Sequence, residues 1–117
     1  ETNLKKIVQV VHVEIRKKMK IFIKRHKNKK IVILDIPLLL ENKINIESDI
    51  LVFVESKKKD IEKRLKSRKG FNSKLFNKFQ KIQLKPNYKK KKAQYVIKNK
   101  FKKNSVKKEI NDILKKI

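Results

Sequence analysis

The segment that decides the fold is residues 31–41, which read Ile31-Val32-Ile33-Leu34-Asp35-Ile36-Pro37-Leu38-Leu39-Leu40-Glu41. Its first six residues are apolar except for Asp35 and mostly β-branched, a composition that favours a strand. The apolar residues are continuous instead of alternating with polar ones, which is typical of a strand covered on both faces in a parallel sheet. Pro37 cannot donate a ladder hydrogen bond, so we expect the strand to end before it.

The rest of the chain alternates between strand and helix patterns. Short apolar runs at residues 50–54 and 95–97 predict two further strands. Apolar residues at helical spacing predict helices over residues 3–27, 57–68 and 73–84, one or two helical turns over 87–92, and a closing helix capped by Ser105. Gly70 is expected to cap the second of these helices. This order of elements predicts an α/β fold with a parallel sheet, in a single domain over residues 1–117.

The composition excludes several kinds of site. The 117 residues contain no Cys and a single glycine, Gly70, whereas loops that cradle nucleotide phosphates need several glycines. The absence of Cys excludes disulfides and thiolate metal sites, no metal site is expected, and the compartment is predicted to be reducing and cytoplasmic. No uncharged apolar run approaches the roughly 20 residues that cross a bilayer, so no membrane association is expected.

The formal charge of +25 raises the alternative of a small lysine-rich nucleic-acid-binding protein. Only four of the 36 basic residues are arginines, however, and Lys, Ile and Asn are abundant together, a bias that AT-rich codons produce without selection for binding. The aromatic residues among the lysines stand at helical spacing and are interpreted as core. They are Phe71, Phe76, Phe79 and Tyr88. No specific nucleic-acid partner is therefore predicted.

Four residues are candidates for chemistry on their pattern alone. Asp35 stands where α/β nucleotide enzymes place an acid that holds Mg²⁺ or its water, although a strand also ends in Asp where a turn follows. Arg64 and Arg68 are four residues apart on one predicted helix face and could bind a polyphosphate together, unless Arg64 pairs with Asp60 on a solvated face. His12 lies within the first helix, where a lone His is more often packed than catalytic.

The segment from Val32 to Glu41 resembles the central motif of dephospho-coenzyme A kinases, an apolar strand followed by Asp, one residue, Pro-Leu-Leu, an apolar residue and Glu. Further family features follow in the same order along the chain. His12 matches a family His, Arg64 and Arg68 match arginines of the lid helix, and the last matches are Gln83, Lys89, Ala93 and Val96 to Asn99. This sequence departs from the family at Lys98, which replaces an Asp, and in having no Gly after Asn99.

The resemblance implies a P-loop-kinase-like parallel sheet with flanking helices and a helical lid, the lid and substrate-side helices being about residues 57–92. It covers only about the C-terminal three-fifths of the family's domain. The glycine-rich P-loop, and the acidic segment that supplies the family's catalytic Asp, are expected to precede residue 1. The chain is thus interpreted as one partial kinase domain, inactive by itself and of unknown oligomeric state.

The resemblance also implies an activity. The γ-phosphoryl group of ATP is transferred to the ribose 3′-hydroxyl of dephospho-coenzyme A, which is the last step of coenzyme A synthesis. Arg64 and Arg68 are expected to neutralise phosphate charge as the lid closes, and Asp35 to orient Mg²⁺ or its water. His12, Glu41 and Lys89 are expected on the substrate side. ATP and dephospho-coenzyme A are therefore the expected partners, with ATP as co-substrate.

Overall fold

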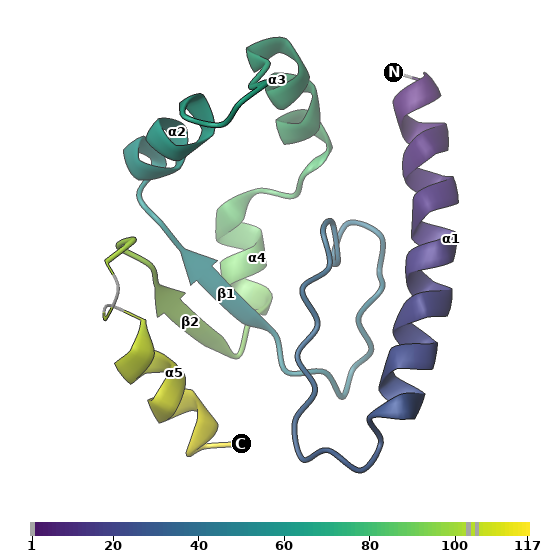
Figure 1. Cartoon of the computed structure of the whole chain (residues 1–117), viewed down its shortest axis with the longest axis vertical. Coiled ribbons are helices and arrows are strands. Elements are labelled where there is room, and N and C mark those ends of the chain that lie inside the picture. The colour runs from purple at the N-terminus through teal and green to yellow at the C-terminus, as the bar shows by residue number, and fades with distance from the viewer. Residues whose placement is uncertain (1, 103, 105) are drawn as a thin grey trace. The chain divides into compact units, whose positions relative to one another are not determined.

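The computed structural model describes residues 2–102, 104 and 106–117. Figure 1 shows its elements in chain order, which are α1 (Thr2–Arg25), β1 (Val52–Glu55), α2 (Lys58–Lys66), α3 (Ser73–Ile82), α4 (Pro86–Lys92), β2 (Tyr95–Lys98) and α5 (Lys107–Leu114). They fall into two compact units, Glu1–Asn45 and Ile46–Ile117. Each unit is described by itself below.

The first unit consists of α1 and the irregular chain that follows it. The helix closely matches the amphipathic pattern at residues 3–27, but the strand expected at residues 31–36 is absent. None of those six residues makes a backbone hydrogen bond within the described part of the chain. A strand exists only through pairing with a neighbour, and no extended partner is available here. The prediction of a strand at this position is therefore wrong for the chain as described.

A tight turn follows Pro37 and closes the first unit. The amide of Asn42 donates to the carbonyl of Leu38 at 3.1 Å, and the amide of Ile44 donates to the carbonyl of Leu39 at 3.0 Å. Leu38 has a φ of 56°, a left-handed conformation that is uncommon for a residue with a branched side chain. The turn buries Ile44, whose side chain is only 3% exposed.

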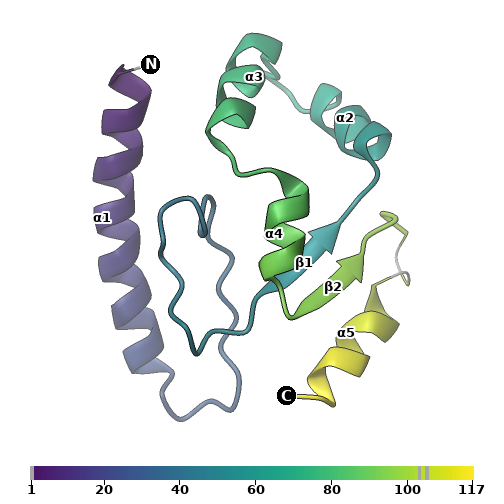
Figure 2. The same cartoon turned by 180° about the vertical axis from the view of Figure 1, so that it is seen from behind.

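The second unit is built on a parallel pair of strands, as the alternation of strands and helices predicted. The register places Phe53 opposite Val96 and Val54 opposite Ile97. Ile97 is the most buried apolar residue of this unit, at 8% exposed. Seen from behind in Figure 2, α2, α3 and α4 form the connection between the two strands. Such a helical crossover is what joining parallel strands requires.

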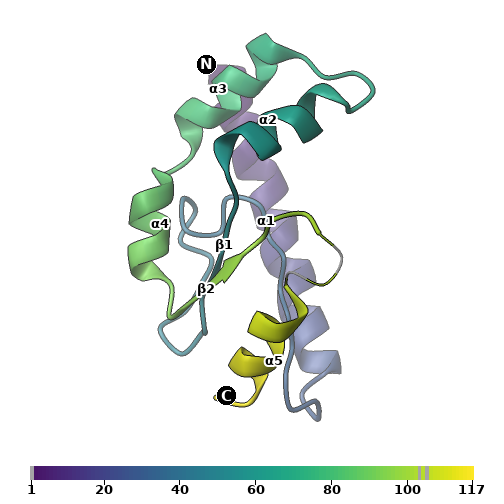
Figure 3. The ribbon, with the colours of Figure 1, turned by 90° about the vertical axis from the view of Figure 1, so that its left-hand side faces the viewer.

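The two helices nearest the strands lie on opposite sides of the sheet. Figure 3 shows the strands between α4 and α5. Pro86 occupies the first turn of α4, where a missing N–H costs nothing. At the start of α5 the expected cap, Ser105, lies outside the described residues, and the carboxylate of Glu109 accepts from the amide of Lys98 at 2.6 Å. That bond links α5 to the end of β2.

The helices α2 and α3 are each shorter than the sequence predicted. The side chain of Asn72 caps α3 by accepting from the amide of Leu75 at 3.0 Å. Helix α2 ends at Lys66 with Ser67 as its cap, so Gly70 is not the capping residue. Gly70 has a φ of 78° and lies in a turn in which the amide of Phe71 donates to the carbonyl of Arg68. A type II turn requires such a positive φ at its third position.

Candidate functional site

In the first unit, His12 is held by the turn that follows Pro37. Its ring is buried at 7% exposed, and its Nε2 lies 2.9 Å from the side-chain nitrogen of Asn42. The same nitrogen donates to the carbonyl of Leu38 at 3.0 Å, which identifies it as the amide donor. The Nε2 of His12 is therefore the acceptor, which assigns the ring N–H to Nδ1.

The other ring nitrogen of His12 has no partner. Its Nδ1 is buried without a hydrogen bond in the described part of the chain. Nearby, the guanidinium of Arg16 donates to the carbonyl oxygen of Asn42 at 2.5 Å and more weakly to that of Lys43 at 3.4 Å. One face of α1 thus fixes the turn through two side chains spaced one helical turn apart, and the Nδ1–H of His12 remains as a donor.

Asp35 and Glu41 flank Pro37 in the same unit. Asp35 is exposed and Glu41 is half-buried. Asp35 lines an open groove of about 550 Å³ together with apolar residues of α1 and with Lys18 and Arg25. Asp35 and Glu41 therefore lie in residues 35–42 of the first unit, and His12 contacts the end of this segment through Asn42.

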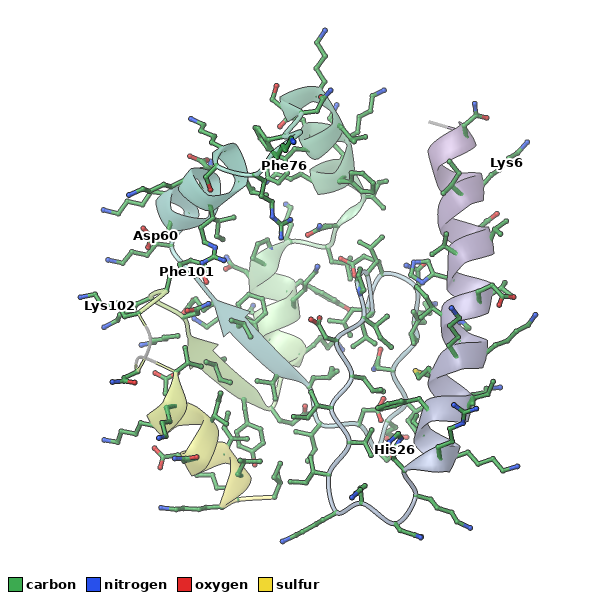
Figure 4. The ribbon with its side chains drawn as sticks, in the orientation of Figure 1. Lys6, His26, Asp60, Phe76, Phe101 and Lys102 are labelled. Carbon is green, nitrogen blue, oxygen red and sulfur yellow. The ribbon has the colours of Figure 1, made fainter. Side chains whose placement is uncertain are left out.

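In the second unit, Arg64 lies in the last turn of α2, and Arg68 lies beyond the helix. The prediction that both arginines share one helix face is wrong, because α2 ends at Lys66. The alternative, an ion pair between Asp60 and Arg64, is also not formed in the described part of the chain. The guanidinium of Arg64 instead lies over the ring of Phe101, with its central carbon 4.6 Å from the ring centroid. Figure 4 labels Phe101 between α2 and the ends of the strands.

Lys89 lies on α4 and is half-buried. Its neighbour Lys90 forms an ion pair with Glu55, the last residue of β1, at 2.6 Å. The hydrogen bond and charge of Lys90 hold the pKa of Glu55 below its ordinary value against a smaller opposing effect of burial, with a further contribution from Lys98. This pair fixes α4 to the carboxyl end of β1.

The candidate residues therefore form two groups. His12, Asp35 and Glu41 belong to the first unit, and Arg64, Arg68 and Lys89 belong to the second. No group of three or more His, Cys, Asp or Glu side chains suited to a metal ion is found among the described residues. Within the same part of the chain, every helix is too short or too polar to span a bilayer.

Three residues that make the contacts described above were not identified from the sequence, namely Arg16, Asn42 and Phe101. Asn42 directly follows the acidic residue of the central motif, so its position was a signal that could have been used. Arg16 follows His12 by four residues, the spacing that places two side chains on one helix face. Phe101 carried no such signal, because its contact joins a helix to a loop far along the chain.

The fold and these side chains identify the structural class of this chain, and the comparison with known proteins then identifies its family. The chain is an α/β protein with parallel strands joined by a helical crossover, and that crossover carries an arginine directed at the loop after the second strand. The model of the dephospho-CoA kinase family matches residues 1–105, and the chain belongs to this family.

Two curated relatives agree with the family assignment. The chain is 30% identical over 116 residues to the dephospho-CoA kinase of Wolbachia pipientis wMel, and 28% identical over 116 residues to that of Wolbachia sp. subsp. Brugia malayi (strain TRS). Each match covers 97% of this chain and 59% of the relative, so the chain spans less than two thirds of the relatives' length. No solved structure gives a significant match.

Proposed function

We propose that this chain is the larger, C-terminal part of a cytoplasmic dephospho-CoA kinase that phosphorylates the ribose 3′-hydroxyl of dephospho-coenzyme A with ATP. The family match over residues 1–105 carries the proposal, because it includes all six candidate residues. In the reaction the 3′-oxygen forms a bond to the γ-phosphorus and the bond to the bridging oxygen of ADP breaks. The hydroxyl proton passes to a base. We place this base in the part of the family's domain that precedes the region matched by this chain.

The roles of this chain's residues follow from phosphoryl-transfer chemistry. Catalysis of this kind is mostly positioning and neutralisation of phosphate charge. Arg64 is suited to it because its guanidinium N–H donors make no hydrogen bond in the described part of the chain and are available for phosphate oxygens. We assign Arg68 to the same phosphates. His12, Glu41 and Lys89 are assigned to the substrate side, where the buried Nδ1 of His12 has no partner among the described residues.

The described residues fit a Mg²⁺ ion that arrives bound to the nucleotide, and they do not fit an ion held by the protein alone. The described residues contain no cluster of acidic and His side chains that would hold a resident ion. Asp35, an exposed carboxylate, is suited to an ion that arrives with the nucleotide, because Mg²⁺ is commonly bound by one or two carboxylates plus substrate phosphates. When bound, the ion would neutralise charge on the phosphates.

The test joins the chain at residue 1 to the P-loop-bearing segment of a dephospho-CoA kinase. We expect the joined protein to release ADP only when dephospho-coenzyme A is present, and the 117-residue chain alone to release none, since it contains no phosphate-binding glycine loop. The matched control carries the same P-loop segment on the donor enzyme's own C-terminal part. A folded joined protein that stays inactive while the control turns over would refute the proposal.

A further inference from the structure

The contact between Arg64 and Phe101 joins two segments that are distant in sequence. The guanidinium carbon lies 4.6 Å from the ring centroid, well within the roughly 6 Å over which a cation is attracted to an aromatic face. Arg64 belongs to α2, and Phe101 belongs to the loop that follows β2. The contact therefore connects the helical crossover to the carboxyl edge of the sheet.

The loop that carries Phe101 is anchored at that edge. The amide of Asn99 donates to the carbonyl of Glu55, the last residue of β1, at 2.8 Å. The side-chain oxygen of Asn99 in turn accepts from the amide of Phe101 at 2.8 Å. Phe101 has a φ of 54°, a conformation that costs free energy for a residue with a Cβ and persists only where neighbouring bonds enforce it. Its ring is thus held in one place while remaining 38% exposed.

The contact with Phe101 leaves the guanidinium of Arg64 able to bind a ligand. No carboxylate pairs with Arg64 in the described part of the chain, although Asp60 lies one helical turn before it. The guanidinium carbon lies over the ring of Phe101, and its five N–H donors make no hydrogen bond in the described part of the chain. The carboxyl edge of a parallel sheet is also where α/β proteins bind their ligands.

We propose that Phe101 is a positioning residue that holds the guanidinium of Arg64 at the carboxyl edge of the sheet, oriented to bind the phosphates of ATP. This inference rests on the proposed function and adds to it a residue that acts through Arg64. The affinity for ATP then depends on an aromatic ring at position 101.

The contact itself is tested without any activity measurement. Only four arginines are present, so the side-chain Nε–Hε signals of Arg16, Arg25, Arg64 and Arg68 can be followed separately by NMR. We expect the Arg64 signal to be shifted upfield by the ring, to keep that shift in Phe101→Tyr and to lose it in Phe101→Leu. Phe71→Leu is the matched control, because Phe71 packs against Phe76 in a tilted arrangement instead. An Arg64 signal unaffected by Phe101→Leu would overturn the proposal.

The positioning role is tested by titrating the protein joined to a P-loop segment with ATP in the presence of Mg²⁺ and measuring the affinity by calorimetry. Phe101→Leu should weaken ATP binding by about two- to fivefold, the loss expected for an exposed cation–π contact, and Phe101→Tyr should restore it. In Arg64→Ala, adding Phe101→Leu should weaken binding no further. Unchanged affinity in Phe101→Leu would overturn the inference alone. Failure of the joined protein with Phe101 unchanged to bind ATP, while the ring shift persists, would overturn the proposed function, and the phosphate role with it.

Discussion

The side-chain amide of Asn42 satisfies two acceptors at once, the Nε2 of His12 and the carbonyl of Leu38. Asn42→Ala leaves the buried Nε2 unpaired, which costs about 1–3 kcal/mol. Because about 1.4 kcal/mol is a factor of ten, we expect the amide of Ile44 to exchange with solvent roughly five- to a hundredfold faster. Hydrogen exchange by NMR measures this rate, with Asn28→Ala at an exposed site as the control. Equal rates in the two variants would contradict the assigned bond.

Arg64 is expected to act on the transition state. In the protein joined to a P-loop segment, Arg64→Ala should lower turnover on the order of a hundredfold or more, as loss of a cation on the transferring phosphoryl group does. Arg64→Lys should recover only part of this, because Lys is a point charge without the planar fork. Lys66→Ala removes a charge from the same helix and should change turnover by less than about twofold. Normal turnover in Arg64→Ala would remove this residue from the site.

At the scale of elements, α4 is fixed to β1 by the pair of Lys90 and Glu55. Lys90 lowers the pKa of the Glu55 carboxyl in the folded state, so the pair stabilises the protein above the ordinary glutamate pKa of 4.5. That contribution is lost as the pH falls through the lowered pKa. In urea unfolding followed by circular dichroism, Glu55→Gln should be less stable than the wild type near neutral pH and should approach it in acid. The exposed Glu47→Gln should follow the wild type throughout. A constant difference at every pH would exclude this role of the pair.

The unpaired segment at residues 31–36 gives a second prediction at this scale. Its backbone groups make no hydrogen bonds in the described chain, so its amides should exchange at close to intrinsic rates, while those of β1 and β2 that bond across the strand pair are protected. Joining a P-loop segment that supplies a neighbouring strand should slow exchange at residues 31–36. Protection of these amides in the 117-residue chain alone would show that they already have a partner.

The same segment shows what the sequence could and could not predict. The runs at residues 50–54 and 95–97 were correctly predicted to contain strands, which span Val52–Glu55 and Tyr95–Lys98, because they pair with each other within one unit. The run at residues 31–36 has the stronger strand composition yet forms none, since composition reports the preference of a segment and not the presence of its neighbour. Similarly, the Asp, Pro and Glu of the motif were visible in sequence, whereas the stacking of Arg64 on Phe101 depends on how a helix and a loop meet.

At the scale of the whole molecule, the charge of +25 supports the competing hypothesis of nucleic-acid binding. If most of this charge is a solvated lysine surface, binding to DNA or RNA should be independent of sequence and should fall by about 10³–10⁵ between 50 and 200 mM salt, for six to ten phosphate contacts. Fluorescence anisotropy with unrelated labelled oligonucleotides measures both properties. ATP and dephospho-coenzyme A should still bind the joined protein at the higher salt, since stacked and bidentate contacts are screened less than long-range attraction. Sequence-selective binding that survives about 200 mM salt, in a joined protein with no affinity for either nucleotide, would establish the nucleic-acid hypothesis in place of the kinase.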